Sequence, residues 1–433
     1  MAETAPSPVL IFRKAAWAAA VAVIFLAATM KPLLFVANQR LSPPDILFPA
    51  AFVLMLGAVA ARQLRLRFDR AYVYLAAYFA AMLVSSVFSV DPRTSYLRLA
   101  GEMYLLGLAA LIIVQLDSEA RLKHAVYAWL AGTVLAVSIA IISLSLYYVS
   151  PDNWLLAHTL YTFGAVPVVN FPRVSSTMIS ASMFCNFLTV GIALLYLARE
   201  RSWVSRRIFI LSLAASVLAV ISTISIGIGG VALVIGACTY LTRSLTRPRL
   251  AKASLVIGIA AAAVFYFMSF AALRPHATSP FSIDLPVIGN IQPSSRVLVW
   301  IASFKTFADD PLTGKGLGQP ACAVSFENTD GSYSMLTDAH NIFLSVAAQS
   351  GSLGLAAILA LSLYLWRLGR RSDDPSVKLV WAAFVSAFLY QGMVGAYEDT
   401  RHLWIFIGIL VAASDLGGRA EQSLAHGTGV RPA

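Results

Sequence analysis

The feature that most constrains this chain is an uncharged stretch from Ala253 to Leu273. At 1.5 Å per residue, a helix over this stretch is about 30 Å long, which matches the hydrocarbon core of a bilayer. Comparable apolar runs occur along the whole chain, near 15–37, 46–61, 71–90, 97–116, 124–149, 176–198, 208–224, 227–241, 253–273, 341–366, 379–396 and 402–416. The sequence therefore predicts an all-α integral membrane protein with about twelve transmembrane helices.

The composition agrees with a membrane location and argues against other classes. Charged residues make up 12% of the chain, whereas soluble domains carry roughly 25%. The net charge of +11 does not indicate a nucleic-acid partner, because the basic residues form short clusters between apolar runs. The three cysteines form no CxxC pair, so we expect them to be structural.

The spacing of the basic clusters predicts the topology. The stretch from Ile208 to Leu241 is too long for one span, so we divide it at Gly227, Gly229 and Gly230, where glycine permits a tight reversal. The first apolar run lacks a cleavage site and is expected to be retained. With both termini cytoplasmic, most of the 32 Lys and Arg fall on the cytoplasmic side, as membrane insertion favours.

The organisation follows from this topology. Residues 1–416 form one membrane domain with two long outer segments, 150–175 and 274–340, and residues 417–433 are expected to be a disordered cytoplasmic tail. From Ser294 to Asp310 the second segment has a helical amphipathic pattern, which predicts a helix along the membrane surface. The apolar positions of that pattern are Val297, Trp300, Ile301, Phe304 and Phe307.

Several catalytic motifs are missing from the sequence. It contains no GxxxxGK[ST] phosphate loop, no HExxH, no DxD pair and no GxSxG elbow, so it supports neither ATP hydrolysis nor a bound metal. Asp309 and Asp310 are adjacent and would point about 100° apart on a helix, so they indicate the end of a helix before Pro311. We therefore expect no cofactor and no metal.

His340 is the strongest candidate for chemistry, in the stretch TDAHNIFLSVAAQSGSLG between the long outer segment and an apolar helix. A histidine there meets both water and the membrane, and its ordinary pKa near 6.5 suits a general base. Asp338 or Asn341 could orient its ring. Position alone allows an equal alternative, in which these are polar residues at a helix start and Asp338 is the N-cap.

The pattern of His340 and Asn341, nine further residues, Gly351, two residues and Gly354 resembles the signature of the O-antigen ligase family, and PLTGKGLG precedes it. The resemblance covers the second half of the chain best. It implies a GT-C-like glycosyltransferase architecture with twelve spans in the bacterial inner membrane and an active site facing the periplasm. The implied activity moves a glycan from undecaprenyl diphosphate to a lipid A core acceptor, without metal or nucleotide sugar.

The resemblance also implies roles for single residues. His340 becomes the expected catalytic residue, and Arg173 in NFPRVSST and Arg296 in PSSRVLVW become candidates to bind the donor diphosphate, since arginine binds phosphate bidentately. Either arginine could instead reach lipid headgroups. Secondary candidates are Lys315 in the glycine turn, Asp338, Asn341, and Arg401, which could pair with Glu398 or Asp399.

Some features of the sequence leave alternatives open. Gly314, Gly316 and Gly318 could bring backbone amides to a phosphate or form a plain turn, and Gly351 and Gly354 are expected to let neighbouring helices pack closely. Family members commonly carry a Ser-Arg-Gly element at an outer turn where this chain reads ISTISIGIGG, so the group that replaces that arginine near Ile226 is open.

Two other functions compete with a ligase. A repeat-unit polymerase would share the lipid-linked donor and differ in the acceptor. A flippase or transporter is less favoured, because the chain has no internal repeat and no charged residue midway along a span. The resemblance implies as partners the lipid-linked donor and the lipid A core acceptor, together with membrane lipids, and the charge pattern indicates no nucleic acid.

Overall fold

The computed structural model describes residues 8–36, 39–66, 68–166, 171–242, 248–274, 282–285, 289–327, 333–395, 397 and 400–427. Over these ranges the protein is a mostly helical, multi-pass membrane protein. Seven of the described helices are long and apolar enough to cross a bilayer. They are α2 (Pro43–Ala60), α3 (Arg70–Val87), α4 (Pro92–Gln115), α5 (Glu119–Val149), α7 (Ala181–Glu200), α10 (Pro248–Met268) and α12 (Ile342–Arg371).

The other predicted apolar runs also correspond to helices. Some of these helices are shorter than a full span. Two further helices, α6 and α11, lie in the outer segments and do not belong to the predicted apolar runs. These remaining helices are α1 (Pro8–Leu26), α8 (Arg206–Ser222), α9 (Ile228–Leu241), α13 (Pro375–Ala383), which continues as the π-helix η1 (Phe384–Tyr390), α14 (Arg401–Gly427), α6 (Trp154–Thr159) and α11 (Ser295–Asp309).

The helix α7 forms the centre of the bundle and is almost entirely buried. It packs against α5, α8, α9 and α13, and Phe187 stacks on Trp129 of α5 with ring centroids 5.1 Å apart. A buried polar cluster crosses the same region, where Gln391 donates to Thr189 at 2.7 Å and Asn186 lies 2.7 Å from His402. This core ties the last two helical segments to the middle of the chain.

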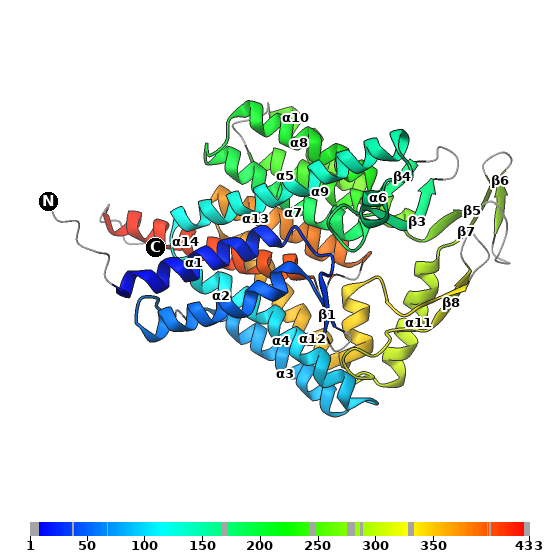
Figure 1. Cartoon of the computed structure of the whole chain (residues 1–433), viewed down its shortest axis with the longest axis horizontal. Coiled ribbons are helices and arrows are strands. Elements are labelled where there is room, and N and C mark those ends of the chain that lie inside the picture. Colours follow the sequence, from blue (N-terminus) through cyan, green and yellow to red (C-terminus); the bar gives the residue numbers. More distant parts are fainter. Residues whose placement is uncertain are drawn as a thin grey trace.

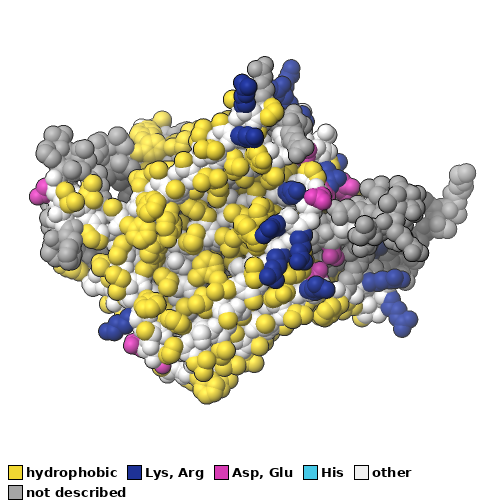
Figure 2. Space-filling model, turned by 180° about the vertical axis from the view of Figure 1, so that it is seen from behind, with side chains coloured by type: hydrophobic (Ala, Val, Ile, Leu, Met, Phe, Trp, Pro, Cys, Tyr) yellow, Lys and Arg dark blue, Asp and Glu magenta, His cyan; other side chains and the backbone are white. Residues whose placement is uncertain are grey.

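The helices run roughly along the long axis of the molecule, and its two ends differ (Figure 1). The start of α1 and the end of α14 lie at one end, and α11 with most of the strands lies at the other. Seen from behind, a broad apolar face occupies the middle, with Lys and Arg gathered at one side of it (Figure 2). An apolar belt between polar ends is the form expected of a chain that crosses a bilayer.

Two helices end before their apolar runs do and are followed by strands. The run from 15 to 37 gives a helix only to Leu26, because the backbone amides of Met30 and Lys31 both donate to the carbonyl of Thr177. After that point the chain forms the hairpin of β1 (Leu34–Val36) and β2 (Gln39–Leu41). The helix predicted over 253–273 likewise ends at Met268, and Ala271–Arg274 forms strand β5.

The reversal predicted at the glycines near position 227 is confirmed, but the reason given for it is wrong. Gly227 has an ordinary φ of −55°, and the left-handed residue of this turn is Ile224, with a φ of 45°. The glycines are needed for packing instead. A Cβ on Gly229 would lie 2.2 Å from the hydroxyl of Tyr390, and one on Gly230 would lie 2.6 Å from Nε2 of Gln391.

The outer segments contain strands that the sequence did not predict. The strands β3 (Leu160–Val166) and β4 (Phe171–Val174) pair antiparallel. In the longer segment, β5 and β6 (Ile283–Leu285) flank β7 (Gly289–Pro293), and β8 (Val324–Glu327) pairs with β9 (Tyr333–Leu336). The helix predicted over 294–310 is present as α11, with Ile301 and Phe304 more than half exposed. Its placement on the membrane surface stays a prediction.

The last helix is longer than its apolar run. The sequence places the end of the span at Leu416 and expects a disordered tail from 417, whereas α14 continues as a helix to Gly427. Residues 428–433 lie outside the described residues.

Candidate active site

Arg173 is held on the hairpin of the first outer segment. Its neighbours Pro172 and Val174 are buried, so the strand alternation places Arg173 on the other face of β4. Nε of Arg173 donates to the carbonyl of Thr223 at 3.3 Å, and its guanidinium carbon lies 5.1 Å from the ring centroid of Tyr161. Its terminal amino groups have no hydrogen-bond partner within the described residues and are available to an anion.

Arg296 occupies the first turn of α11 and lacks a full set of partners. Its Nε is buried and has no hydrogen-bond partner in the part of the chain that the structure describes. Burial lowers the pKa of Arg296, nearby Tyr397 raises it, and the charge of Arg173 lowers it further. The two predicted arginines therefore lie close enough to repel each other. An unpartnered buried N–H costs about 1–3 kcal/mol, a cost that a bound anion would remove.

His340 completes this cluster from a third part of the chain. Its backbone is left-handed, with a φ of 48°, and its backbone amide donates to Oδ1 of Asp338 at 2.7 Å. Nδ1 of the ring lies 3.7 Å from Oδ2 of Asp338, and the side chain is 40% exposed. Burial lowers the pKa of His340, Asp338 raises it, and Arg296 lowers it. Asp338 is thus the residue beside the ring, and Arg296 is near enough to affect its charge.

Asn341 does not orient the histidine. It is the N-cap of α12, where its Oδ1 accepts from the amides of Phe343 at 3.0 Å and Leu344 at 3.2 Å. Its Nδ2 donates to the carbonyl of Met393 at 3.2 Å. Both polar groups of Asn341 therefore have partners, and its Oδ1 caps α12, which corrects the alternative in which Asp338 caps this helix.

The glycine turn from Pro311 to Gly318 is a plain structural turn. Gly314, Gly316 and Gly318 all have positive φ angles, at 68°, 110° and 76°. Their amides donate within the protein, to the carbonyl of Asp310, the carbonyl of Gln349 and Oε1 of Gln349 respectively. No free amide of these glycines is left for a phosphate.

Lys315 lies in the same turn and is fixed through its backbone. Its amide donates to the carbonyl of Ala348 at 3.1 Å, and its carbonyl accepts from the amide of Val90 at 3.3 Å. Among the described residues, no contact joins its side chain to the arginines or the histidine. The structure does not bring this secondary candidate into the cluster.

Gly351 links the turn to α12. Its φ of 62° and ψ of −162° interrupt the helix, and a Cβ there would lie 2.2 Å from the carbonyl oxygen of Leu312. Beside it, the amide of Ser352 donates to the carbonyl of Pro311 at 2.8 Å. The expected packing role of Gly351 is correct, but its partner is the glycine turn and not a neighbouring helix. The kink at Gly351 sets the direction of the first part of α12, which begins at Ile342 beside His340.

Arg401 forms a partly buried ion pair with Asp45. Its Nε lies 2.9 Å from Oδ1 of Asp45 and its second amino group lies 3.0 Å from Oδ2. Asp45 also accepts from the amide of Ser42 at 2.7 Å, where it completes the capping box of α2. The predicted partners Glu398 and Asp399 lie outside the described residues. Arg401 therefore ties α14 to α2.

Two residues near the cluster were not predicted. Tyr397 is buried, its hydroxyl donates to the carbonyl of Ser182 at 3.3 Å, and its pKa is raised, chiefly by burial. Nζ of Lys31 lies 3.4 Å from Oγ of Ser175, two residues after Arg173, and burial lowers the pKa of Lys31 to about 8. The one signal for Lys31 in the sequence was a lone cation inside the first predicted apolar run.

The turn near Ile226, where the resemblance implies a Ser-Arg-Gly element, is next to this cluster. Its Thr223 carbonyl accepts the hydrogen bond from Arg173. The turn therefore contributes a backbone acceptor that holds Arg173, and Lys31 is a further cation beside the same hairpin. Among the described residues, no three His, Cys, Asp or Glu side chains are grouped so that they could hold a metal ion.

These features define a multi-pass helical membrane protein with two arginines, a histidine and a carboxylate gathered at one end. Residues 209–359 match the family model described as O-antigen ligase, which confirms the resemblance seen in the sequence. This domain is shared by O-antigen ligases and polymerases and indicates a glycan-transferring protein with lipid-linked substrates. The match includes Arg296 and His340, and Arg173 precedes it. Comparison with curated proteins finds none that matches the chain.

Proposed function

We propose that this protein is an O-antigen ligase of lipopolysaccharide biosynthesis. It transfers a glycan from undecaprenyl diphosphate to a lipid A core oligosaccharide, without a metal and with inversion of the anomeric centre. The observation that carries the proposal is the cluster of Arg173, Arg296 and His340, which belong to three segments far apart in the sequence. The family match over residues 209–359 supports the same class of reaction.

The arginines act on the leaving group. Transfer breaks the bond between the anomeric carbon and the diphosphate oxygen, and negative charge grows on that oxygen as the bond lengthens. Guanidinium groups form short, charge-assisted hydrogen bonds to phosphate oxygens and stabilise such charge. The free amino groups of Arg173 and the unpartnered Nε of Arg296 can donate hydrogen bonds to a diphosphate bound between them.

His340 acts on the acceptor hydroxyl. A neutral imidazole accepts the hydroxyl proton through Nε2 while the oxygen attacks the anomeric carbon from the face opposite the diphosphate, which inverts that centre. Asp338, near Nδ1, stabilises the imidazolium that results. The lowered pKa of His340 keeps the ring neutral at neutral pH, so the base is ready before the acceptor binds.

The proposed location is the bacterial inner membrane, with twelve spans in a GT-C-like architecture, both termini cytoplasmic and the site facing the periplasm. This orientation is supported by the basic clusters in alternate connections, since membrane insertion retains such clusters in the cytoplasm. The position of α1 and α14 at the end opposite the strands of the outer segments agrees with it (Figure 1).

The test is glycan transfer by protein purified in detergent. The reaction contains an undecaprenyl diphosphate-linked glycan, a lipid A core acceptor and EDTA, and a gel shift of the acceptor reports transfer. We expect His340→Ala to lower the rate by a factor of about 10²–10⁴, the usual contribution of a general base. The matched control is His158→Ala, at an exposed histidine of α6 on the same outer end.

The outcomes of this assay distinguish a ligase from a polymerase and from a transporter. Transfer to the core that needs His340 and survives EDTA supports a metal-independent ligase. Lengthening of the glycan on its carrier would replace the ligase by a polymerase. A wild-type protein that performs neither reaction would overturn the proposal and favour transport of the lipid-linked glycan.

A further inference from the structure

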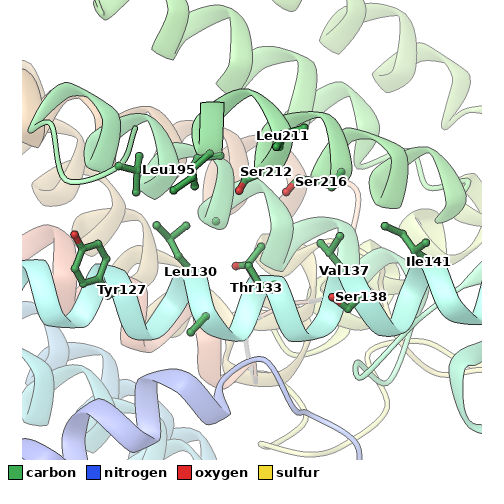
Figure 3. Close-up of a pocket in the computed structure, with 16 residues that line it drawn as sticks. Tyr127, Leu130, Thr133, Val137, Ser138, Ile141, Leu195, Leu211, Ser212 and Ser216 are labelled. Carbon is green, nitrogen blue, oxygen red and sulfur yellow. The ribbon is translucent and has the colours of Figure 1, made fainter. Parts of the chain in front are cut away.

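A long apolar groove lies between α5 and α8, apart from the cluster of charged residues. Its volume is about 380 Å³, and its lining contains no charged side chain. Leu130 and Val137 of α5 lie opposite Leu211 and Ser216 of α8 (Figure 3). Gly191 of α7 also lines the groove, where a Cβ would lie 2.8 Å from Oγ1 of Thr133, so α7 lies close against α5 there.

The length of the groove indicates what kind of chain fits it. On α5 its lining extends from Tyr127 to Ile141, which corresponds to about 21 Å along a helix axis. The hydrocarbon core is about 30 Å thick, so one leaflet contributes about 15 Å. The groove therefore continues past the middle of the bilayer. The acyl chain of an ordinary phospholipid, which stays within one leaflet, would leave part of it empty.

The groove leads to the strand that carries Arg173. The strand β4 contacts both helices that form the two walls. Directly after β4, Oγ of Ser176 donates to the carbonyl of Ala136 on α5 at 2.6 Å, and Nε of Arg173 donates to the carbonyl of Thr223 at the end of α8 at 3.3 Å. An anionic head at Arg173 would thus lie at the outer end of α8, about 10 Å along that helix from Ser216, the last residue of α8 that lines the groove.

We propose that this groove binds the polyprenyl chain of the lipid-linked donor while Arg173 and Arg296 hold its diphosphate. The inference rests on the proposed function and adds the place of the lipid chain. A polyprenyl chain is apolar, as the lining of the groove is. It is also long enough to enter at the hairpin and continue past the midplane of the bilayer. Binding of the chain there fixes the diphosphate against the arginines and leaves the glycan on the outer side.

The first test uses two adjacent alanines of α8. Ala215 lines the groove, and Ala214 is exposed on the outside of the bundle. Donors with the same glycan on an undecaprenyl or a farnesyl diphosphate are compared with wild type, Ala215→Trp and Ala214→Trp. We expect Ala215→Trp to raise KM for the undecaprenyl donor at least fivefold and to raise KM for the farnesyl donor less, because the shorter chain fills only the outer end of the groove. Ala214→Trp should match wild type with both donors.

The second test measures binding without transfer. Undecaprenyl diphosphate with a diazirine on its chain is photocrosslinked to the wild-type protein in vesicles of phosphatidylethanolamine and phosphatidylglycerol. We expect labelled peptides from α5 and α8, and loss of label when unlabelled undecaprenyl diphosphate is added. Extra phosphatidylglycerol should not compete.

The outcomes separate this inference from the proposed function. Equal KM values for Ala215→Trp and Ala214→Trp, label confined to other helices, or equal competition by phosphatidylglycerol would each overturn the groove. Absence of transfer with either donor would overturn the proposed function, while the crosslinks still decide whether the groove holds the polyprenyl chain.

Discussion

Replacement of Gly351 by alanine should strongly destabilise the protein. Gly351 combines a φ of 62° with a ψ of −162°, a region that residues with a Cβ rarely enter. The added Cβ would also lie 2.2 Å from the carbonyl oxygen of Leu312, which is backbone and cannot rotate away. The conformation and the contact therefore both oppose the substitution.

The size of the effect follows from these two terms. Backbone strain of this kind costs about 1–3 kcal/mol, and overpacking that must move neighbouring backbone costs about 1–3 kcal/mol more. We expect a loss of about 4 kcal/mol. With an unfolding entropy of about 2.1 cal/mol/K per residue over 433 residues, each kcal/mol shifts the melting temperature by about 1 °C, so the melting temperature should fall by about 4 °C. Transfer should fall too, because the kinked part of α12 begins beside His340.

The assay is thermal unfolding in detergent, followed by tryptophan fluorescence, with Gly101→Ala as the matched control. Gly101 lies inside α4, and a Cβ there meets nothing within 4 Å. That variant should be neutral or more stable by about 0.5–1 kcal/mol, since alanine favours a helix. Equal melting temperatures for Gly351→Ala and Gly101→Ala would refute the reasoning.

Three further predictions concern charged residues. Arg401→Met should lower the free energy of unfolding by about 3 kcal/mol because it leaves Asp45 buried without its partner, and Arg401→Met combined with Asp45→Leu should recover much of this loss in the same melting assay. Asp338→Asn should shift the acid limb of kcat/KM against pH to lower pH, because Asp338 raises the pKa of His340 and a base is active only when neutral; an unchanged limb would contradict that contact. Donor binding by wild type, measured by titration, should weaken as pH rises through about 8, where Lys31 loses its charge, and Lys31→Arg should remove this dependence.

Much of the fold could be predicted from the sequence, because a helix that faces lipid must be apolar over its whole length. The predicted runs therefore correspond to helices throughout the chain. Helix ends were less predictable. The end of α1 depends on hydrogen bonds from Met30 and Lys31 to Thr177, and hydropathy contains no information on a partner so far along the chain.

The candidate site was predictable only in its main groups. His340 and the two arginines were found from a motif and from their positions on outer segments. The choice between Asp338 and Asn341 required the left-handed backbone of His340, which places Asp338 beside the ring while Asn341 starts the helix. Tyr397 was missed because only the folded chain places it near Arg296.

The closeness of Arg173 and Arg296 has a consequence for the end of the catalytic cycle. On the proposed chemistry, the spent carrier keeps its diphosphate and has an exposed terminal phosphate with more negative charge than the donor had. The same two guanidinium groups should then hold the product more tightly than the substrate. Release of the empty carrier would set the turnover rate, and the rate of lipopolysaccharide assembly would depend on how quickly other enzymes in the membrane hydrolyse and recycle undecaprenyl diphosphate.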